Sequence, residues 1–159
     1  MIMQAAVAQP GRVDRVALVN SAGFGKTVTI AIRALDIPVI GPKLLMPSMV
    51  MAKNVERSLY RDQRIVTSER IQLGFDMLSQ PNAVRALEET ARFLGSFRGV
   101  HEAWRRTLLD QFKALGKPTL VIWGTHDKIL PATHMENAKR ELPQAQHHLF
   151  QRVGHMPQT

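Results

Sequence analysis

Three short runs of mostly apolar or β-branched residues are separated by long segments with helical periodicity. The runs are Arg15–Asn20 (RVALVN), Thr119–Trp123 (TLVIW) and Ala145–Phe150 (AQHHLF). The continuous apolar centres of the first two are typical of strands buried on both faces of a sheet. Strands joined by long helical crossovers pair in parallel. The pattern therefore predicts the α/β fold class, with a parallel sheet of three strands.

Helices are expected on both sides of these strands. The segments with helical patterns are Met1–Gln9, a short Thr27–Leu35, Glu102–Leu115 and Ala132–Leu142. Pro10-Gly11 ends the first of these helices, and Pro143 ends the last, because proline and glycine disfavour the continuation of a helix. The small side chains of the first helix allow it to lie close to the sheet.

The middle of the chain interrupts the alternation of strands and helices. Its start is expected to be broken by Pro38, Gly41, Pro42 and Pro47, and three helices are then predicted at Ser48–Arg61, Thr67–Ser79 and Asn82–Phe97. In the third helix, Val84, Leu87, Ala91 and Leu94 fall on one face at helical spacing. We therefore expect three parts: residues 1–35, a helical block at 36–112, and residues 113–159.

Two polar residues follow predicted strands at the edge where functional groups of parallel sheets collect. Asp127 comes just after Thr119–Trp123, and Gly154-His155 comes soon after Ala145–Phe150. A serine nucleophile needs an imidazole to take its proton and a carboxylate to orient that imidazole. Asp127 and His155 are therefore candidates for the acid and the base of a catalytic triad. We predict that the two side chains lie within hydrogen-bond or one-water reach. A turn-forming aspartate and an ordinary loop histidine are the alternatives.

Several motifs give these positions a family context. The segments KPTLVIWGTHDKILP, ATHMENAKRELP, AQHHLF and GHMPQ resemble the C-terminal third of an α/β-hydrolase. In that family the acid follows one late strand and the histidine follows the next, and Asp127 and His155 match those positions. The segment MIMQAAVAQPGRVDRVALVNSAG resembles the helix and strand that follow the nucleophile elbow, G-x-S-x-G. The resemblance implies the last three strands of the family's sheet, with residues 36–112 as a cap that shapes the substrate pocket. It also implies a chain truncated at both ends.

The nucleophile is the missing part of this pattern. No G-x-S-x-G occurs, and Ser21 in Asn-Ser-Ala-Gly lacks the glycine two residues before it. We interpret Ser21 as a pocket-floor or capping residue. By resemblance, the complete protein is a serine hydrolase without an external cofactor. It would act on a small apolar substrate, at an ester or an activated bond next to a carbonyl. The chain alone is expected to be inactive, and a catalytically inactive fragment or scaffold of the family is the alternative.

A second motif favours a different class. Ser21–Thr27 (SAGFGKT) follows a strand and resembles a phosphate-binding P-loop, although Asn20 occupies the first required glycine position. Nucleotide binding is therefore a distant third hypothesis, and a glycine-rich turn with a surface lysine is the simpler interpretation.

Composition narrows the remaining classes. The formal net charge is +8, but basic residues are mixed with acidic ones and few aromatic residues accompany them, so no nucleic-acid partner is expected. The chain has no cysteine and no H-E-x-x-H motif, and His147-His148 would point to opposite faces of a strand, so no metal site is expected. Met1–Ala8 is too short for a membrane span. We expect a cytoplasmic protein, with self-association through the exposed edge of Arg15–Asn20.

Overall fold

The computed structural model describes residues 2–37 and 40–159, and its centre is a three-stranded sheet. The strands are β1 (Val16–Val19), β4 (Thr119–Gly124) and β5 (Gln146–Phe150), in the order β1-β4-β5. Both pairs are parallel, with Val16 opposite Thr119 and Leu120 opposite Gln146. The predicted parallel sheet is confirmed, and each strand lies within a residue or two of its expected range.

Helices cover one face of this sheet. They are α1 (Ile2–Ala8), α7 (Glu102–Ala114) and α8 (Thr133–Glu141), and a 3₁₀ turn at Pro10–Arg12 follows α1. Their apolar side chains pack with the inward-facing residues of the strands around Trp123, whose side chain is fully buried. The indole Nε1–H donates to the carbonyl of Leu130 at 3.1 Å, so the ring brings no unpaired donor into the core.

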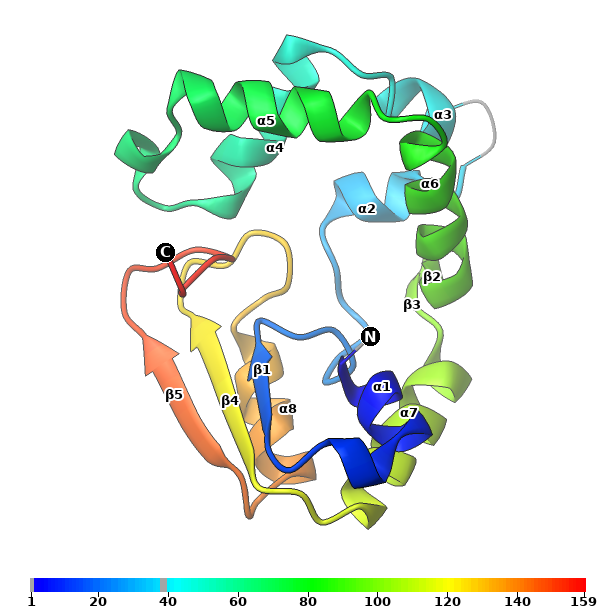
Figure 1. Ribbon diagram of the computed structural model, residues 1–159, viewed down its shortest axis with the longest axis vertical. Coiled ribbons are helices and arrows are strands. Elements are labelled where there is room, and N and C mark those ends of the chain that lie inside the picture. The colour runs from blue at the N-terminus through cyan, green and yellow to red at the C-terminus, as the bar shows by residue number, and fades with distance from the viewer. Residues whose placement is uncertain (1, 38–39) are drawn as a thin grey trace.

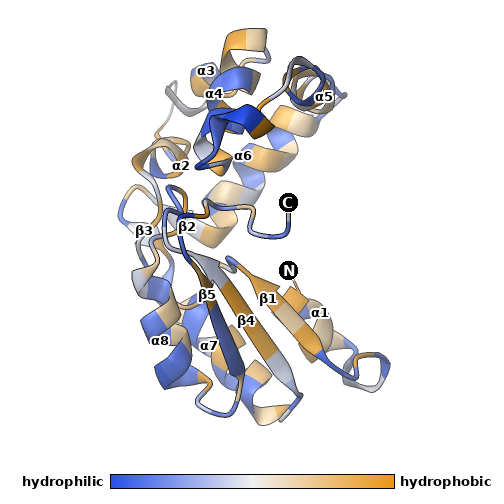
Figure 2. Cartoon of the chain, turned by 90° about the vertical axis from the view of Figure 1, so that its left-hand side faces the viewer, coloured by the Kyte–Doolittle hydropathy of each residue, from blue (hydrophilic) through white to orange (hydrophobic). Residues whose placement is uncertain are grey.

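The opposite face of the sheet is apolar along β1 and β4 and hydrophilic along β5, and no helix of the described chain covers it (Figure 2). Ala17 of β1 is exposed, and Val19 beside it is half-buried. Leu120 and Ile122 of β4 are also only half-buried and lie in register with these two residues. The residues on this face differ sharply from Val121 and Trp123, which are fully buried on the other face.

A group of helices lies beyond the carboxyl ends of the strands (Figure 1). They are α2 (Ile30–Ala34), α3 (Ile40–Leu44), α4 (Met49–Leu59), a 3₁₀ turn at Gln63–Ile65, α5 (Ser68–Leu78) and α6 (Ala83–Leu94). Local capping defines the starts of two of them. The Ser48 hydroxyl accepts from the Met51 backbone N–H at 3.1 Å, and Thr67 caps α5 in the same way.

The structure changes two details of the predicted middle segment. The proline- and glycine-rich start contains the one-turn helix α3, because proline is tolerated in a first helical turn, where its missing N–H has no intrahelical partner. Pro38, and Met1 of the predicted first helix, lie outside the described residues. The helix predicted to Phe97 ends at Leu94, and a two-stranded hairpin follows, formed by β2 (Gly95–Ser96) and β3 (Gly99–Val100).

The predicted boundary at residue 112 divides α7. Leu108, Leu109 and Phe112 are buried in the core shared with α1 and the sheet. We therefore propose that the helical block ends at residue 100 and that α7 belongs to the core. The name "cap" is used below for residues 36–100.

Candidate active site

Asp127 lies in the turn after β4 with its carboxylate held from several sides. Its Oδ1 accepts the backbone N–H groups of Ile129 at 2.7 Å and Leu130 at 3.0 Å. Aspartate commonly accepts such bonds from residues two and three positions ahead in a turn. The side chain is completely buried. A buried carboxylate is stable only when charge-assisted hydrogen bonds replace the lost water, and Asp127 has them.

His155 lies after β5 and contacts the other oxygen of the same carboxylate. The distance from His155 Nδ1 to Asp127 Oδ2 is 2.8 Å. An ionised carboxylate only accepts, so Nδ1 is the donor and Nε2 is left to accept a proton. The predicted contact between these two residues is therefore present, and the imidazole has the orientation that a general base requires. The catalytic roles of both residues stay predictions.

Two glycines allow close backbone approach to the loop after β5: Gly124 lets the end of β4 approach this loop, and Gly154 lets the loop approach the end of α4. A Cβ at Gly124 would lie 2.2 Å from the carbonyl oxygen of Gly154, and one at Gly154 would lie 2.5 Å from the carbonyl oxygen of Leu59. The loops are also hydrogen-bonded, with the His126 N–H donating to the Val153 carbonyl at 2.8 Å. The Asp127–His155 distance is thus set by direct backbone packing at the carboxyl ends of adjacent strands.

The cap contributes to the position of His155. The backbone N–H of His155 donates to the carbonyl oxygen of Leu59, the last residue of α4, at 2.8 Å. Tyr60 follows and is buried, and its ring packs against the Arg70 guanidinium, whose carbon lies 4.8 Å from the ring centroid. Arg70 also pairs with Glu56 at 3.3 Å. The histidine loop therefore rests on a part of the cap that has its own side-chain contacts.

Asn20 is the site residue that sequence reasoning missed. It follows β1, is 4% exposed, and its Nδ2 donates to Asp127 Oδ2 at 2.7 Å. The two residues are 107 positions apart, so no local sequence motif indicates the contact. The available signal was a polar residue at the carboxyl end of a buried strand, the edge of a parallel sheet at which Asp127 and His155 also lie.

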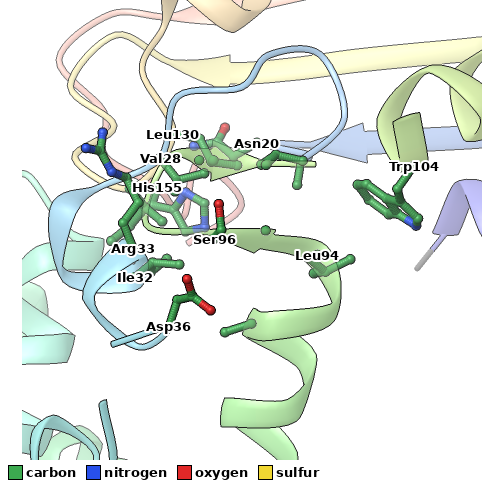
Figure 3. A pocket seen from close by; sticks show the side chains of 16 residues that line it. Asn20, Val28, Ile32, Arg33, Asp36, Leu94, Ser96, Trp104, Leu130 and His155 are labelled. Atoms are coloured by element: carbon green, nitrogen blue, oxygen red, sulfur yellow. The ribbon is translucent and has the colours of Figure 1, made fainter. Parts of the chain in front are cut away.

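A cavity of about 270 Å³ opens beside His155. Its walls come from the loop after β1, α2, α6, the β2–β3 hairpin and the turn after β4 (Figure 3). Most of the lining is apolar: Ala22, Val28, Ile32, Ala91, Leu94, Val100, Trp104, Ile129 and Leu130. Small-molecule sites have this character, with a few polar groups among apolar walls. Ala91 and Leu94 belong to the apolar face predicted for the third cap helix, so part of that face lines the cavity.

Two charged residues, Arg33 in α2 and Asp36 just after this helix, hold one wall of this cavity in place. Arg33 Nε donates to the Phe97 carbonyl at 2.8 Å, and its guanidinium carbon lies 5.3 Å from the centroid of the Phe97 ring. Asp36 Oδ2 accepts the Phe97 backbone N–H at 3.1 Å. Both side chains thus grip the turn of the β2–β3 hairpin, so these charges hold the wall in place.

Ser21 does not reach the site. Its hydroxyl donates to the carbonyl of Ala22 at 3.3 Å, and the residue is not among those that line the cavity. Ser21 therefore does not line this cavity, and its interpretation as a pocket-floor or capping residue stays a prediction. The P-loop geometry is also absent, because α2 begins only at Ile30 and the Lys26 carbonyl accepts the N–H of Val100 at 3.0 Å. A P-loop needs its lysine and threonine at the start of the helix, with backbone N–H groups turned toward a phosphate.

His134 is a second buried histidine, close to but separate from the pair. It is 2% exposed, its ring packs edge-on against Trp123 with centroids 5.9 Å apart, and a Cβ on Gly25 would collide with it. Burial lowers the pKa of His134 below its ordinary value of 6.5, Arg105 adds to the lowering, and the Asp127 carboxylate opposes it. We therefore expect a neutral imidazole that packs in the core.

Other site types find little support in the described part of the chain. Residues 2–37 and 40–159 contain no group of three histidine, cysteine, aspartate or glutamate side chains arranged to hold a metal ion. None of the helices within these ranges has the length and apolarity needed to span a bilayer.

The fold and the site together define a class, that of proteins with a histidine–carboxylate pair at the carboxyl ends of late parallel strands beneath a helical cap. Comparison with known proteins agrees. The family described as alpha/beta hydrolase fold matches residues 1–159, and this chain belongs to that family.

Relatives of known sequence span about twice the length of this chain. An uncharacterised protein of Mycobacterium tuberculosis is 31% identical over 168 residues, covering 98% of this chain and 47% of the relative. A 2-hydroxy-6-oxo-6-phenylhexa-2,4-dienoate hydrolase of Burkholderia cepacia is 30% identical over 160 residues, covering 96% of the chain and 51% of the relative.

Solved structures resemble the chain in fold. A mutant of the meta-cleavage product hydrolase CumD from Pseudomonas fluorescens IP01 superposes with a TM-score of 0.70 at 24% identity, covering 98% of this chain and 54% of that one. The 2-hydroxy-6-oxo-6-phenylhexa-2,4-dienoate hydrolase of Rhodococcus sp. strain RHA1 gives a TM-score of 0.68 at 22% identity, with 98% and 53% covered. The likeness extends over the cap as well as the sheet.

Proposed function

We propose that this chain supplies the acid and the general base of a serine hydrolase, as Asp127 and His155. The observation that carries the proposal is the 2.8 Å contact between Asp127 Oδ2 and His155 Nδ1 at the edge of a cap-covered cavity. By the family pattern, the nucleophilic serine and the oxyanion-hole donors come from the half of the relatives' length that this chain does not span.

The geometry gives each group a specific task. His155 Nε2 accepts the proton of the serine hydroxyl as the oxygen attacks the substrate carbonyl, and then delivers it to the leaving group. The Asp127 carboxylate keeps the proton on Nδ1 and stabilises the imidazolium formed in this step. A second round, with water in place of serine, releases the acyl product. None of these steps needs a metal or an organic cofactor.

The cavity supports a substrate class. A cavity of about 270 Å³ with mostly apolar walls fits a small, largely apolar ester, or a molecule with an activated carbon–carbon bond next to a carbonyl. Several relatives are hydrolases of 2-hydroxy-6-oxo-dienoates, which supports the carbon–carbon alternative. Cytoplasmic location and self-association through the free edge of β1 belong to the same proposal. The first rests on the absence of cysteine and the second on the unpaired strand edge.

The test compares this chain with the longest natural reading frame that contains it. We expect a fluorophosphonate probe to label the longer protein stoichiometrically at a serine outside residues 1–159, and not to label the chain alone. The longer protein should hydrolyse an aryl ester, and His155→Ala should abolish the turnover. Labelling at Ser21 would overturn the assignment. Full turnover by the His155→Ala variant would overturn the proposal as a whole, and absence of any turnover would favour the inactive scaffold.

A further inference from the structure

The side-chain amide of Asn20 joins the two loops of the proposed site. One hydrogen bond runs from Asn20 Nδ2 to Asp127 Oδ2 at 2.7 Å, and a second runs from the same nitrogen to the Gly154 carbonyl at 3.3 Å. An amide NH₂ has two donor hydrogens, so both bonds form at once. One side chain on β1 therefore links the acid-bearing turn to the residue immediately before the histidine.

The bond to Asp127 falls on the oxygen that His155 uses. Asp127 Oδ1 is occupied by two backbone N–H groups, while Oδ2 accepts from Asn20 Nδ2 at 2.7 Å and from His155 Nδ1 at 2.8 Å. Two donors on each oxygen leave the carboxylate little freedom to rotate. Without Asn20, Oδ2 would be fixed only by the imidazole that it has to orient.

Asn20 is itself held rigidly. Its backbone N–H donates to the Ile122 carbonyl of β4 at 2.9 Å, and its φ of 41° is in the left-handed region that asparagine tolerates better than most residues. Its Oδ1 is buried and has no partner among the described residues. Turning the amide over would bring Oδ1 against the Asp127 carboxylate and leave two acceptors in contact. The charge on Asp127 therefore fixes which end of the amide faces it.

We propose that Asn20 is a positioning residue that sets the Asp127–His155 geometry, an inference that rests on the proposed hydrolase function. The alternative is that Asn20 merely ties β1 to the loops for stability. The two differ in what they predict for chemistry in a folded variant, because positioning acts on the rate of the proton-transfer step while a structural tie acts on unfolding.

Two substitutions separate these roles. Asn20→Gly removes the side-chain amide and introduces a residue that readily adopts a positive φ. In the longest natural reading frame it should lower kcat about a hundredfold, as misplacement of a catalytic group does, and change KM by less than about threefold. Ser21→Ala, on the neighbouring loop position, is the matched control and should leave both constants within about one order of magnitude of the parent.

Asn20→Asp keeps the shape but replaces the donor with an acceptor. Two carboxyl groups in contact cannot both ionise easily, so the introduced group keeps its proton to higher pH than an isolated aspartate does. While protonated it donates to Asp127 as the amide does. Activity of this variant relative to the parent should therefore be highest near pH 6 and fall at least tenfold by pH 8. A structural tie gives no such pH-dependent ratio.

A spectroscopic readout keeps the inference independent of turnover. The proton on His155 Nδ1 should give a far-downfield ¹H resonance that Ser21→Ala retains and Asn20→Gly loses or broadens by exchange. An unchanged resonance and an unchanged kcat in a folded Asn20→Gly protein would overturn the positioning role. If His155→Ala retains full activity, the hydrolase proposal fails instead, and the resonance alone then decides whether Asn20 orders the pair.

Discussion

His155 and Leu59 are joined by a backbone hydrogen bond of 2.8 Å, from the N–H of the candidate base to the last carbonyl of cap helix α4. The cap and the core thus meet at the residue that would move the proton. Caps of hydrolases are usually considered for what they do to the substrate. Here the cap also supports the histidine loop, so a displacement of α4 would change the position of the candidate base.

The contact at Gly154 gives a first prediction. Gly154→Ala places a methyl group 2.5 Å from the Leu59 carbonyl oxygen and 2.9 Å from the Arg61 nitrogen, so backbone has to shift. We expect a loss of about 1–3 kcal/mol in the free energy of unfolding, as for other overpacked sites. Gly11→Ala, where nothing lies within 4 Å, is the control and should be nearly neutral in a urea titration. Equal stability of the two variants would contradict the close approach.

The triad assignment gives a second prediction. In the longest natural reading frame, His155→Ala should reduce kcat/KM for an aryl ester by about four orders of magnitude or more, because the base is lost. Asp127→Asn should also be severe, since an amide presents the wrong partner to Nδ1. Ser21→Ala should stay within about one order of magnitude. Comparable, severe losses for Ser21→Ala and His155→Ala would make Ser21 the nucleophile.

Buried His134 gives a prediction for the dependence of stability on pH. Its pKa is lowered in the folded state, so unfolding takes up a proton, and the contribution present above pH 6.5 is lost as the pH falls toward the folded pKa. Stability measured by denaturant titration should therefore decline between pH 7 and pH 5. His134→Gln should flatten this decline, while the same change at exposed His101 should leave it unaltered. An identical slope in both variants would assign the effect elsewhere.

The uncovered sheet face and the free edge of β1 predict association of the isolated chain. Exposed strand edges pair with other chains, and an apolar face open to water loses roughly 25 cal/mol for every Å² left unburied. Residues 1–159 alone should be loosely packed, poorly soluble or dependent on a partner chain. Sedimentation velocity should show a concentration-dependent shift that Ala17→Lys, on the exposed edge strand, reduces. Asn54→Lys on the cap makes the same charge change and should not reduce it. A sharp, cooperative monomeric unfolding transition would refute this account.

Local signals were enough to predict much of the fold. Residues 119–123 and 15–20 are recognisable as strands from their apolar runs, and Asp127 and His155 stand out by their positions after strands. Asn20 was missed because its role depends on a contact 107 residues away, which no spacing encodes. The β2–β3 hairpin was missed for another reason. Each strand has two residues, too few to show a period. The hairpin also depends on Gly99, which has a φ of 103° and lacks the Cβ that would collide with the Lys26 carbonyl.

The proposed shift of the boundary from residue 112 to residue 100 depends on tertiary packing, which local pattern does not reveal. Residues 102–114 are largely polar on their surface, and the burial of Leu109 and Phe112 in the core cluster supports our proposal that they belong to the core. Ser21 was interpreted as a pocket-floor or capping residue because its loop follows a strand. The chain turns after Asn20, however, and the Ser21 hydroxyl finds its partner in the adjacent Ala22 carbonyl.

The parallel ladder between β4 and β5 sets the relative position of Asp127 and His155, the candidate acid and base. Ile122 lies opposite His148 and Gly124 opposite Phe150, and from these two rungs the chain runs on to Asp127 and to His155. A slip of one residue moves one strand by about 3.3 Å, more than the tolerance of a hydrogen bond. The pair can therefore form in only one alignment of the two strands. In a chain that folds with these strands out of register, Asp127 and His155 would both be present but could not form their hydrogen bond. Correct pairing of β4 with β5 is therefore a condition for forming the candidate site.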